Sequence, residues 1–363
     1  MDHCLTLRHL ILLAFALLAA SPAAAVVVER LHEVEVAVAD QSPAARAKAF
    51  QLALAEAIVQ LTNDVRAPKA PDLAPLMRAP QRFVAEFAYV TPASEPGVPA
   101  MTTGTATAPA LRLAVHFEGP ALQQALHDAG RAVLGRERPR TLLWLVLDEG
   151  ADRDLVGADD ADPFIAAATR LGLPLAFPAL DAADRAALQP ADVAAQDESK
   201  LGAASARLAA DGSAAEVWLG ALVWRAPRAW QGRFTLGVAL DGAVERFDAK
   251  APTLDGLAAL ALQHVATAMA ARYAVAGGEL LSIELALEGV DGVAAYARAS
   301  QLLEGMSIVR RVEVLGVQHD LLELKVSFIG GAAALERSIA LDPRFARSIV
   351  AAREGTLRYR YAP

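Results

Sequence analysis

The most restrictive feature of this chain is a run of six apolar residues, 142–147 (LLWLVL), with no polar residue inside it. A strand that is apolar on both faces belongs in the middle of a sheet that is covered on both sides. Helical patterns follow near residues 164–171 and 192–210, and another apolar strand follows at 217–224. We therefore predict a central α/β unit over residues 136–275.

Two local signals mark the second half of this unit. Residues 234–240 alternate between apolar and other side chains, and Asp241-Gly242 follows them as a strong two-residue hairpin signal. Thr253 then caps a long helix that runs to about Tyr273. Three polar residues interrupt the apolar run of this helix: Gln263, His264 and Arg272. We interpret it as an amphipathic helix and predict no membrane span there.

Ahead of the central unit we predict an α+β domain over residues 26–135. Its first strand, at residues 33–38, alternates between apolar and other side chains. Ser42 and Pro43 then supply an N-cap and a first helical residue. Residues 91–110 contain four Pro, two Gly and five Thr, with little to bury. We interpret them as a flexible excursion between two paired strands.

After Gly277-Gly278 the pattern becomes compact. A strand, a helix, two strands, a helix and a short last strand follow one another: residues 281–287, 291–305, 312–317, 322–328, 332–339 and 357–361. This βαββαβ order is that of a ferredoxin-like unit. We predict such a unit over residues 276–363, so that the whole chain is a multidomain protein of the α/β and α+β classes.

The N-terminus has the layout of a secretory signal peptide. Eleven apolar residues, 10–20, follow a short polar start and precede an A-x-A site at Ala23 and Ala25. Eleven residues are too few for a stable membrane-spanning helix. We predict a signal peptide at residues 1–25, a mature chain that begins near Val26, and export to a bacterial periplasm.

Composition and motifs exclude several classes of function. The chain has 34 Lys and Arg against 42 Asp and Glu, and its net charge of −8 disfavours binding to nucleic acid or anionic lipid. The only cysteine, Cys4, lies in the predicted signal peptide, so the mature chain has no thiol for a disulfide, a nucleophile or a metal site. No serine-hydrolase, penicillin-binding, Walker or dinucleotide-binding motif is present.

Histidines and acidic residues give no metal site either. The five histidines beyond the signal peptide lack metal-pair spacing on any one predicted element. Residues 148–162 hold seven acids, but Val156 and Pro163 stand where a calcium loop needs oxygen ligands, and we interpret the segment as a solvated acidic loop. We therefore predict no catalytic residue, no metal site and no cofactor.

Four arginines form the one charged cluster that suggests binding. Arg131, Arg136, Arg138 and Arg140 surround Glu137 just before the apolar strand. Guanidinium groups recognise carboxylates and phosphates with two parallel hydrogen bonds, so Arg136, Arg138 and Arg140 are candidates for an anion or partner site. The interpretation that we favour is a domain junction, where these arginines pair with nearby acids such as Glu137.

Three segments together resemble a known family. They are residues 135–139 (GRERP) with 142–145 (LLWL), residues 34–42 (VEVAVADQS) followed by Arg46, Ala49 and Phe50, and residues 203–222. They are similar to the secreted proteobacterial proteins called domain of unknown function 2066, apart from Asp211-Gly212-Ser213, which looks like a small insertion. The resemblance implies no catalytic residues. A weaker fold-level likeness points to exported envelope-assembly proteins related to lipoprotein activators and curli-secretion factors.

These observations predict a non-catalytic binding or assembly module of the cell envelope, with an envelope protein as its partner. Two alternatives stay open. One is a small anionic-ligand binder that uses the cluster from Arg131 to Arg140, and the other is an enzyme whose site is assembled only in three dimensions.

Overall fold

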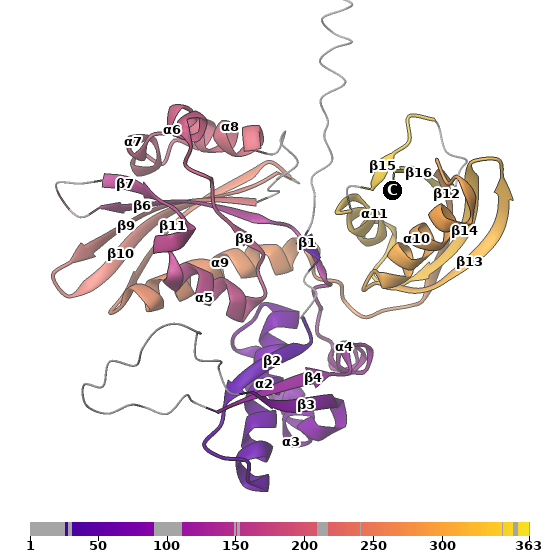
Figure 1. Cartoon of the computed structure of the whole chain (residues 1–363), viewed down its shortest axis with the longest axis horizontal. Coiled ribbons are helices and arrows are strands. Elements are labelled where there is room, and N and C mark those ends of the chain that lie inside the picture. Colours follow the sequence, from indigo (N-terminus) through magenta and orange to yellow (C-terminus); the bar gives the residue numbers. More distant parts are fainter. Residues whose placement is uncertain are drawn as a thin grey trace, which may run out of the picture.

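The structure is a computed structural model that describes residues 26–27, 31–90, 111–148, 150, 153–208, 217–239, 241–342, 344–350 and 355–362. The predicted signal peptide, the predicted excursion at residues 91–110 and the insertion at 211–213 lie outside these residues. The fold is mixed α/β, as the sequence predicts, and its larger sheets belong to three units, which we call N-terminal, central and C-terminal (Figure 1).

The N-terminal unit has a three-stranded antiparallel sheet in the order β2-β4-β3. Its elements are β2 (Glu33–Ala37), α2 (Pro43–Thr62), η1 (Ala67–Lys69), η2 (Pro71–Leu73), α3 (Ala74–Arg78), η3 (Pro80–Phe83), β3 (Val84–Val90), β4 (Arg112–Phe117) and α4 (Gly119–Asp128). The predicted start of α2 is confirmed, because the Ser42 side chain accepts a hydrogen bond from the Ala45 amide at 3.2 Å and Pro43 is the first helical residue.

The central unit has a six-stranded sheet in the order β11-β10-β9-β6-β7, with β8 also paired to β6. Its strands are β6 (Thr141–Asp148), β7 (Arg153–Val156), β8 (Leu175–Ala176), β9 (Val217–Ala226), β10 (Ala229–Val238) and β11 (Ala243–Ala251). Its helices are α5 (Asp162–Leu171), α6 (Ala182–Ala187), α7 (Pro190–Ala194), α8 (Glu198–Leu208) and α9 (Leu254–Tyr273).

Strand β6 lies inside this sheet with helices on both faces, as its apolar sequence predicts (Figure 1). Leu143 and Leu145 belong to the core under α5 and α9, whereas Trp144 and Val146 belong to the core under α7 and α8. The Asp241-Gly242 turn joins β10 and β11 as predicted.

The prediction of one helix over residues 192–210 is wrong. The chain breaks at Gln196, which has a φ of 55°, and the Asp197 side chain then accepts a hydrogen bond from the Lys200 amide at 3.0 Å, where α8 begins.

Among the described residues, α9 is the helix that is long and apolar enough to cross a membrane by length and composition. Eight of its residues are buried in the protein.

The C-terminal unit has a five-stranded sheet in the order β13-β14-β12-β16-β15. Its elements are β12 (Leu281–Glu288), α10 (Gly292–Gly305), β13 (Val309–Gln318), β14 (Leu321–Phe328), α11 (Ala332–Ala340), β15 (Phe345–Arg347) and β16 (Thr356–Tyr361). Its core lies between the sheet and the two helices.

The predicted βαββαβ order is incomplete, because the extra strand β15 precedes the last strand. In a ferredoxin-like unit the second helix returns the chain parallel to the third strand, so that the last strand is antiparallel to the first. Here the edge strand β15 has the direction expected of that last strand, antiparallel to the first strand β12. The chain then reverses, and β16 lies between β15 and β12 and pairs with β12 in parallel.

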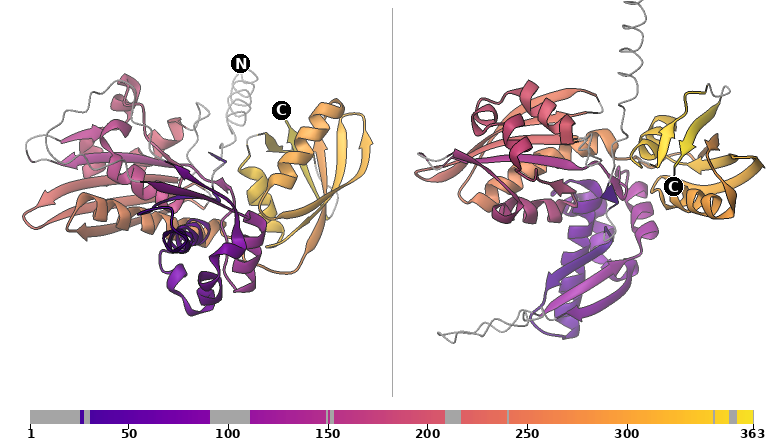
Figure 2. Two further views of the ribbon diagram at one scale, coloured as in Figure 1. Left: turned by 60° about the horizontal axis from the view of Figure 1, so that its bottom comes forward. Right: turned by 45° about the horizontal axis from the view of Figure 1, so that its top comes forward.

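The three units meet where the chain enters and leaves the central unit. Val133 and Val275 exchange two backbone hydrogen bonds of 2.9 and 2.8 Å in an isolated antiparallel bridge. Nearby, β1 (Val26–Val27) pairs with β5 (Glu137–Arg138). The views of Figures 1 and 2 agree that the N-terminal unit lies against the helical face of the central unit that carries α5. The sequence did not indicate any of these pairings.

Candidate functional site

Arg138, one of the predicted site residues, is the most buried charge of the arginine cluster, with 1% of its surface exposed. Its guanidinium donates to the carbonyl oxygens of Gln60 at 2.7 Å, Gly172 at 2.8 Å and Leu171 at 3.2 Å, and its Nε donates to the Gly135 carbonyl at 3.0 Å. Since Gln60 belongs to α2 and Leu171 ends α5, Arg138 connects the N-terminal unit to the central unit.

Burial has opposite consequences for Arg138 and its neighbour Glu137. It lowers the pKa of Arg138 to about 9, which leaves the guanidinium charged at neutral pH, and it raises the pKa of the Glu137 carboxyl. In the described part of the chain no acid forms an ion pair with Arg138. Four carbonyl dipoles stabilise this charge instead.

The other arginines of the cluster have different surroundings. Arg136 donates from Nη2 to the Gly305 carbonyl at 3.1 Å, at the C-terminal end of α10. Arg131 forms a two-bonded ion pair with Asp72, with both distances 2.7 Å. The partly exposed Arg140 lies at the start of the central sheet, where its carbonyl accepts from the Val217 amide. The structure therefore distributes Arg136, Arg138 and Arg140 over one junction, and their binding of an anion or partner stays a prediction.

Arg136 also lines a cavity of about 540 Å³ between α4 and the end of α10. His32 and Arg310 line the same cavity. Burial first, and then the charges of His116, Arg136 and Arg138, lower the pKa of His32 to about 4, so that its imidazole is neutral at pH 7. The buried Nδ1 of His32 has no hydrogen-bond partner within the described residues.

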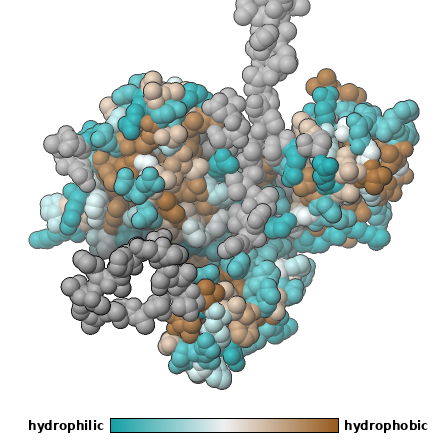
Figure 3. Space-filling view, viewed as in Figure 1, coloured by the Kyte–Doolittle hydropathy of each residue, from teal (hydrophilic) through white to brown (hydrophobic). Residues whose placement is uncertain are grey.

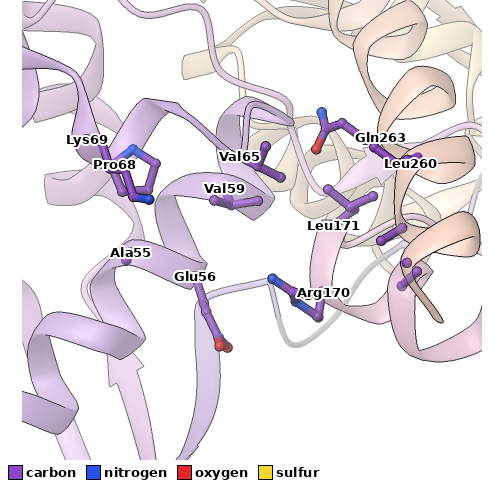
Figure 4. Close-up of a pocket in the computed structure, with 13 residues that line it drawn as sticks. Ala55, Glu56, Val59, Val65, Pro68, Lys69, Arg170, Leu171, Leu260 and Gln263 are labelled. Carbon is purple, nitrogen blue, oxygen red and sulfur yellow. The ribbon is translucent and has the colours of Figure 1, made fainter. Parts of the chain in front are cut away.

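A second and more apolar cavity, of about 460 Å³, lies where the N-terminal and central units meet (Figure 4). We call it the α2–α9 cavity. Its walls come from α2, α5 and α9 and from residues 65–69, which include η1. The apolar lining consists of Ala55, Val59, Val65, Pro68, Ala167, Leu171, Gly256, Ala259 and Leu260. Leu260 and Val65 are 52% and 46% exposed. Apolar side chains are also exposed on other faces, including β13 of the C-terminal unit (Figure 3), but here they line a hollow.

The space exists because two helices that each bury one face in their own core turn small residues toward each other. Helix α2 packs Leu54 and Ile58 into the N-terminal core, and α9 packs Leu257 and Leu262 into the central core. The faces of α2 and α9 that line the cavity carry Ala55, Gly256 and Ala259, and these residues are too small to fill it. The structure exposes Leu260 by 52%, whereas Leu257 and Leu262 of the same helix are fully buried.

Hydrogen bonds hold the two sides of the α2–α9 cavity in place. The side-chain amide of Gln263 in α9 donates to the Asn63 backbone carbonyl at 2.8 Å, and the side-chain amide of Asn63 donates to the Ala266 carbonyl at 3.3 Å. Asn63 ends α2 in the left-handed conformation, with a φ of 52°. These two hydrogen bonds join the end of α2 to α9 beside the cavity.

Three charged residues line the α2–α9 cavity. Arg170, in the last turn of α5, is directed toward α2, on the same side of the cavity as Glu56 (Figure 4). Lys69 lies across from them, at the end of η1. Burial raises the pKa of the Glu56 carboxyl, while the charges of Arg170 and Arg112 act in the opposite direction.

Glu56 and Arg170 also line an adjoining cavity of about 650 Å³ that reaches β2 and has more polar lining residues than the first; we call it the polar cavity. There Arg112 donates to a Glu35 side-chain oxygen at 3.1 Å and to the Glu35 carbonyl at 3.0 Å. Since both cavities have Glu56 and Arg170 in their linings, Arg170 lies at the boundary between them. Within the described residues no group of three His, Cys, Asp or Glu could hold a metal ion.

Comparison with known families gives one match, to residues 25–135, and the matching family is described as Domain of unknown function (DUF8605). This match corrects the predicted resemblance to domain of unknown function 2066, which is a different family. The residues behind that resemblance were mostly strand and core positions, which many α/β chains share. No curated protein and no solved structure matches the chain. The matched segment contains α2 and η1, which form one wall of the α2–α9 cavity.

Proposed function

We propose that this chain is a non-catalytic binding module of the cell envelope, exported by its N-terminal segment, and that it binds a ligand in the α2–α9 cavity. The observation that carries the proposal is the cavity itself: about 460 Å³ between two units, with apolar walls and a few charged residues. Ligand sites in proteins have volumes of roughly 300–1,000 Å³, occur preferentially at domain interfaces, and combine apolar walls with few polar groups.

Binding of a fluorescent dye to the protein and its variants tests the site. The neutral apolar dye N-phenyl-1-naphthylamine should gain fluorescence on binding to the purified protein. Ala259→Trp and Ala55→Trp place an indole in the cavity from opposite walls, and each should abolish the signal. Ala271→Trp, on an exposed position of α9 outside the cavity, is the matched control and should bind dye like the parent chain. Equal binding by all variants would contradict the proposed site.

A protein partner in the envelope is the second candidate function. Strand β13 forms one edge of the C-terminal sheet, and Val314, Leu315 and Val317 on it are 45%, 51% and 60% exposed. Exposed apolar residues at a strand edge are typical of surfaces that bind another chain. In-cell crosslinking followed by mass spectrometry should recover one envelope protein in near-equal amount, and Val317→Lys should reduce its recovery. Recovery that is unaffected by the substitution would contradict this candidate.

Export needs its own experiment. Fractionation followed by N-terminal sequencing should find the protein in the periplasm with a first residue near Val26. Recovery of a full-length form in the cytoplasm would contradict export without affecting the proposed binding site.

A further inference from the structure

We infer that the ligand of the α2–α9 cavity is an amphipathic molecule with one apolar chain and an anionic carboxylate or phosphate head, and that Arg170 contacts the head. This inference rests on the proposed function, because it names the class of ligand for the same site. It is carried by the charges of the cavity and by where they lie relative to its apolar walls.

The apolar walls account for the chain. Val59, Leu171 and Leu260 come from three different helices and face one hollow. Two of the apolar lining residues, Val65 and Leu260, are about half exposed, so a bound alkyl chain would remove apolar surface from water. A fully polar ligand would leave this surface exposed and would gain nothing from the walls.

The cations account for the head. Among the described residues neither Arg170 nor Lys69 forms an ion pair of 4 Å or less, whereas the nearby Arg66, Arg112 and Arg131 each pair with an acid. The acid beside them in the cavity is Glu56, whose burial disfavours its charged form. Two cations and one such acid give the cavity a positive balance at neutral pH.

The position of Arg170 fixes the orientation. Arg170 lines both the apolar cavity and the polar cavity beside it, so it lies where a chain would end and a head would begin. A guanidinium matches the two oxygens of a carboxylate or phosphate with parallel hydrogen bonds. The acids Glu33 and Glu35 also line the polar cavity, and Arg112 pairs with Glu35. A large anionic head that extended into this cavity would be repelled by these acids, which favours a compact head that stays near Arg170.

Calorimetric titration with four twelve-carbon probes, each below its micelle concentration, tests the inference. The probes are dodecanoate, dodecyl phosphate, dodecanol and dodecyltrimethylammonium. We expect at least one of the two anions to bind ten-fold or more tightly than dodecanol and the cation. The ranking of the two anions distinguishes a carboxylate from a phosphate source.

Substitution of the exposed arginine then assigns the head contact. Arg170→Gln should remove the ten-fold preference for the anion and leave dodecanol binding unchanged, and Lys69→Gln should reduce the preference by a smaller factor. Arg66→Gln, which removes an exposed cation that does not line the cavity, is the matched control and should change nothing.

The outcomes separate the two proposals. If the cation binds most tightly, or if Arg170→Gln keeps the anion preference, the inference is overturned while the site remains. If dodecanol binds as tightly as both anions, the head contact is wrong and the apolar site still stands. If no probe binds and the neutral dye does not bind either, the proposed function itself fails.

Discussion

The N-terminal and C-terminal units follow the same path through space and complete it differently. In both, a strand leads through a helix to a pair of strands and then to a second helix, and in both the third strand lies between the first and the second. The C-terminal unit adds β16 and β15 beside its first strand and reaches five strands. The N-terminal unit has three described strands, and α2 lies between its own sheet and the central unit.

The difference shows how a small α/β unit obtains enough buried surface. The C-terminal unit closes its core with its own strands, since Phe345, Tyr359 and Tyr361 of the added hairpin belong to that core. The N-terminal unit instead relies on a neighbour, because Val59 of α2 packs against the central core and Arg138 connects Gln60 to α5. The shared interface that results also forms the α2–α9 cavity.

The largest effect is expected from Arg138→Met. It removes the charge but leaves four buried or partly buried carbonyls without their donor, which we expect to cost about 3–5 kcal/mol of stability. Hydrogen exchange resolved by peptide should show that the N-terminal and central units lose protection together while the C-terminal unit keeps it. Uniform loss over all three units would break the comparison.

Two matched core substitutions test whether the N-terminal unit, unlike the C-terminal unit, depends on the central unit. Leu54→Ala in α2 and Leu335→Ala in α11 each remove a fully buried leucine, and each should cost about 2–4 kcal/mol. Denaturant titration with unit-resolved exchange should show Leu335→Ala confined to the C-terminal unit. Leu54→Ala should destabilise the central unit as well. Confinement of the Leu54→Ala effect to the N-terminal unit would show that α2 does not couple the units.

A pH-dependent effect is expected where the N-terminal unit faces the C-terminal unit. The folded-state pKa of His32, about 4, lies below its ordinary value of 6.5, so the unfolded chain binds a proton that the folded chain does not. Stability should therefore fall as the pH drops from about 6.5 to about 4, by roughly 1–2 kcal/mol after allowance for the partial exposure of His32. Denaturation at pH 7 and pH 4.5 measures this loss, and His32→Gln should reduce it. An unchanged loss would assign the acid sensitivity to other groups.

The smallest effect is expected from the ion pair on the surface of the N-terminal unit. Asp72→Asn breaks the pair with Arg131, and because both side chains are partly exposed the cost to stability should be small. Thermal unfolding in low and high salt checks this expectation, because added salt should remove most of the difference between the variant and the parent chain. A cost comparable to that of Arg138→Met would contradict the contrast between surface and junction arginines.

The sequence predicted those elements whose signals are local. The buried strand β6, the Ser42 cap of α2 and the Asp241-Gly242 hairpin each depend on a few adjacent residues, and the structure confirms them. Strand β15 has three residues, too few to show a periodicity, and its omission made the predicted order of the C-terminal unit incomplete.

The candidate site could not be predicted from local sequence signals. The arginine cluster was predicted as a site because its charges are close together in the sequence, but Arg138 donates to backbone carbonyl oxygens that no side-chain pattern indicates. The α2–α9 cavity depends on small residues from helices about 110 and 200 positions apart, such as Ala55, Ala167 and Ala259. Alanines of this kind are common on helices, and only their arrangement in space makes a hollow.

Native mass spectrometry of the protein purified from the cells that produce it tests the central claim most directly. The parent chain should carry an additional mass of lipid-like size that organic extraction releases, and Ala271→Trp should carry the same mass. Ala259→Trp should appear at its bare mass. A bare mass for the parent chain, or an identical adduct on Ala259→Trp, would contradict the assignment of the α2–α9 cavity as the binding site.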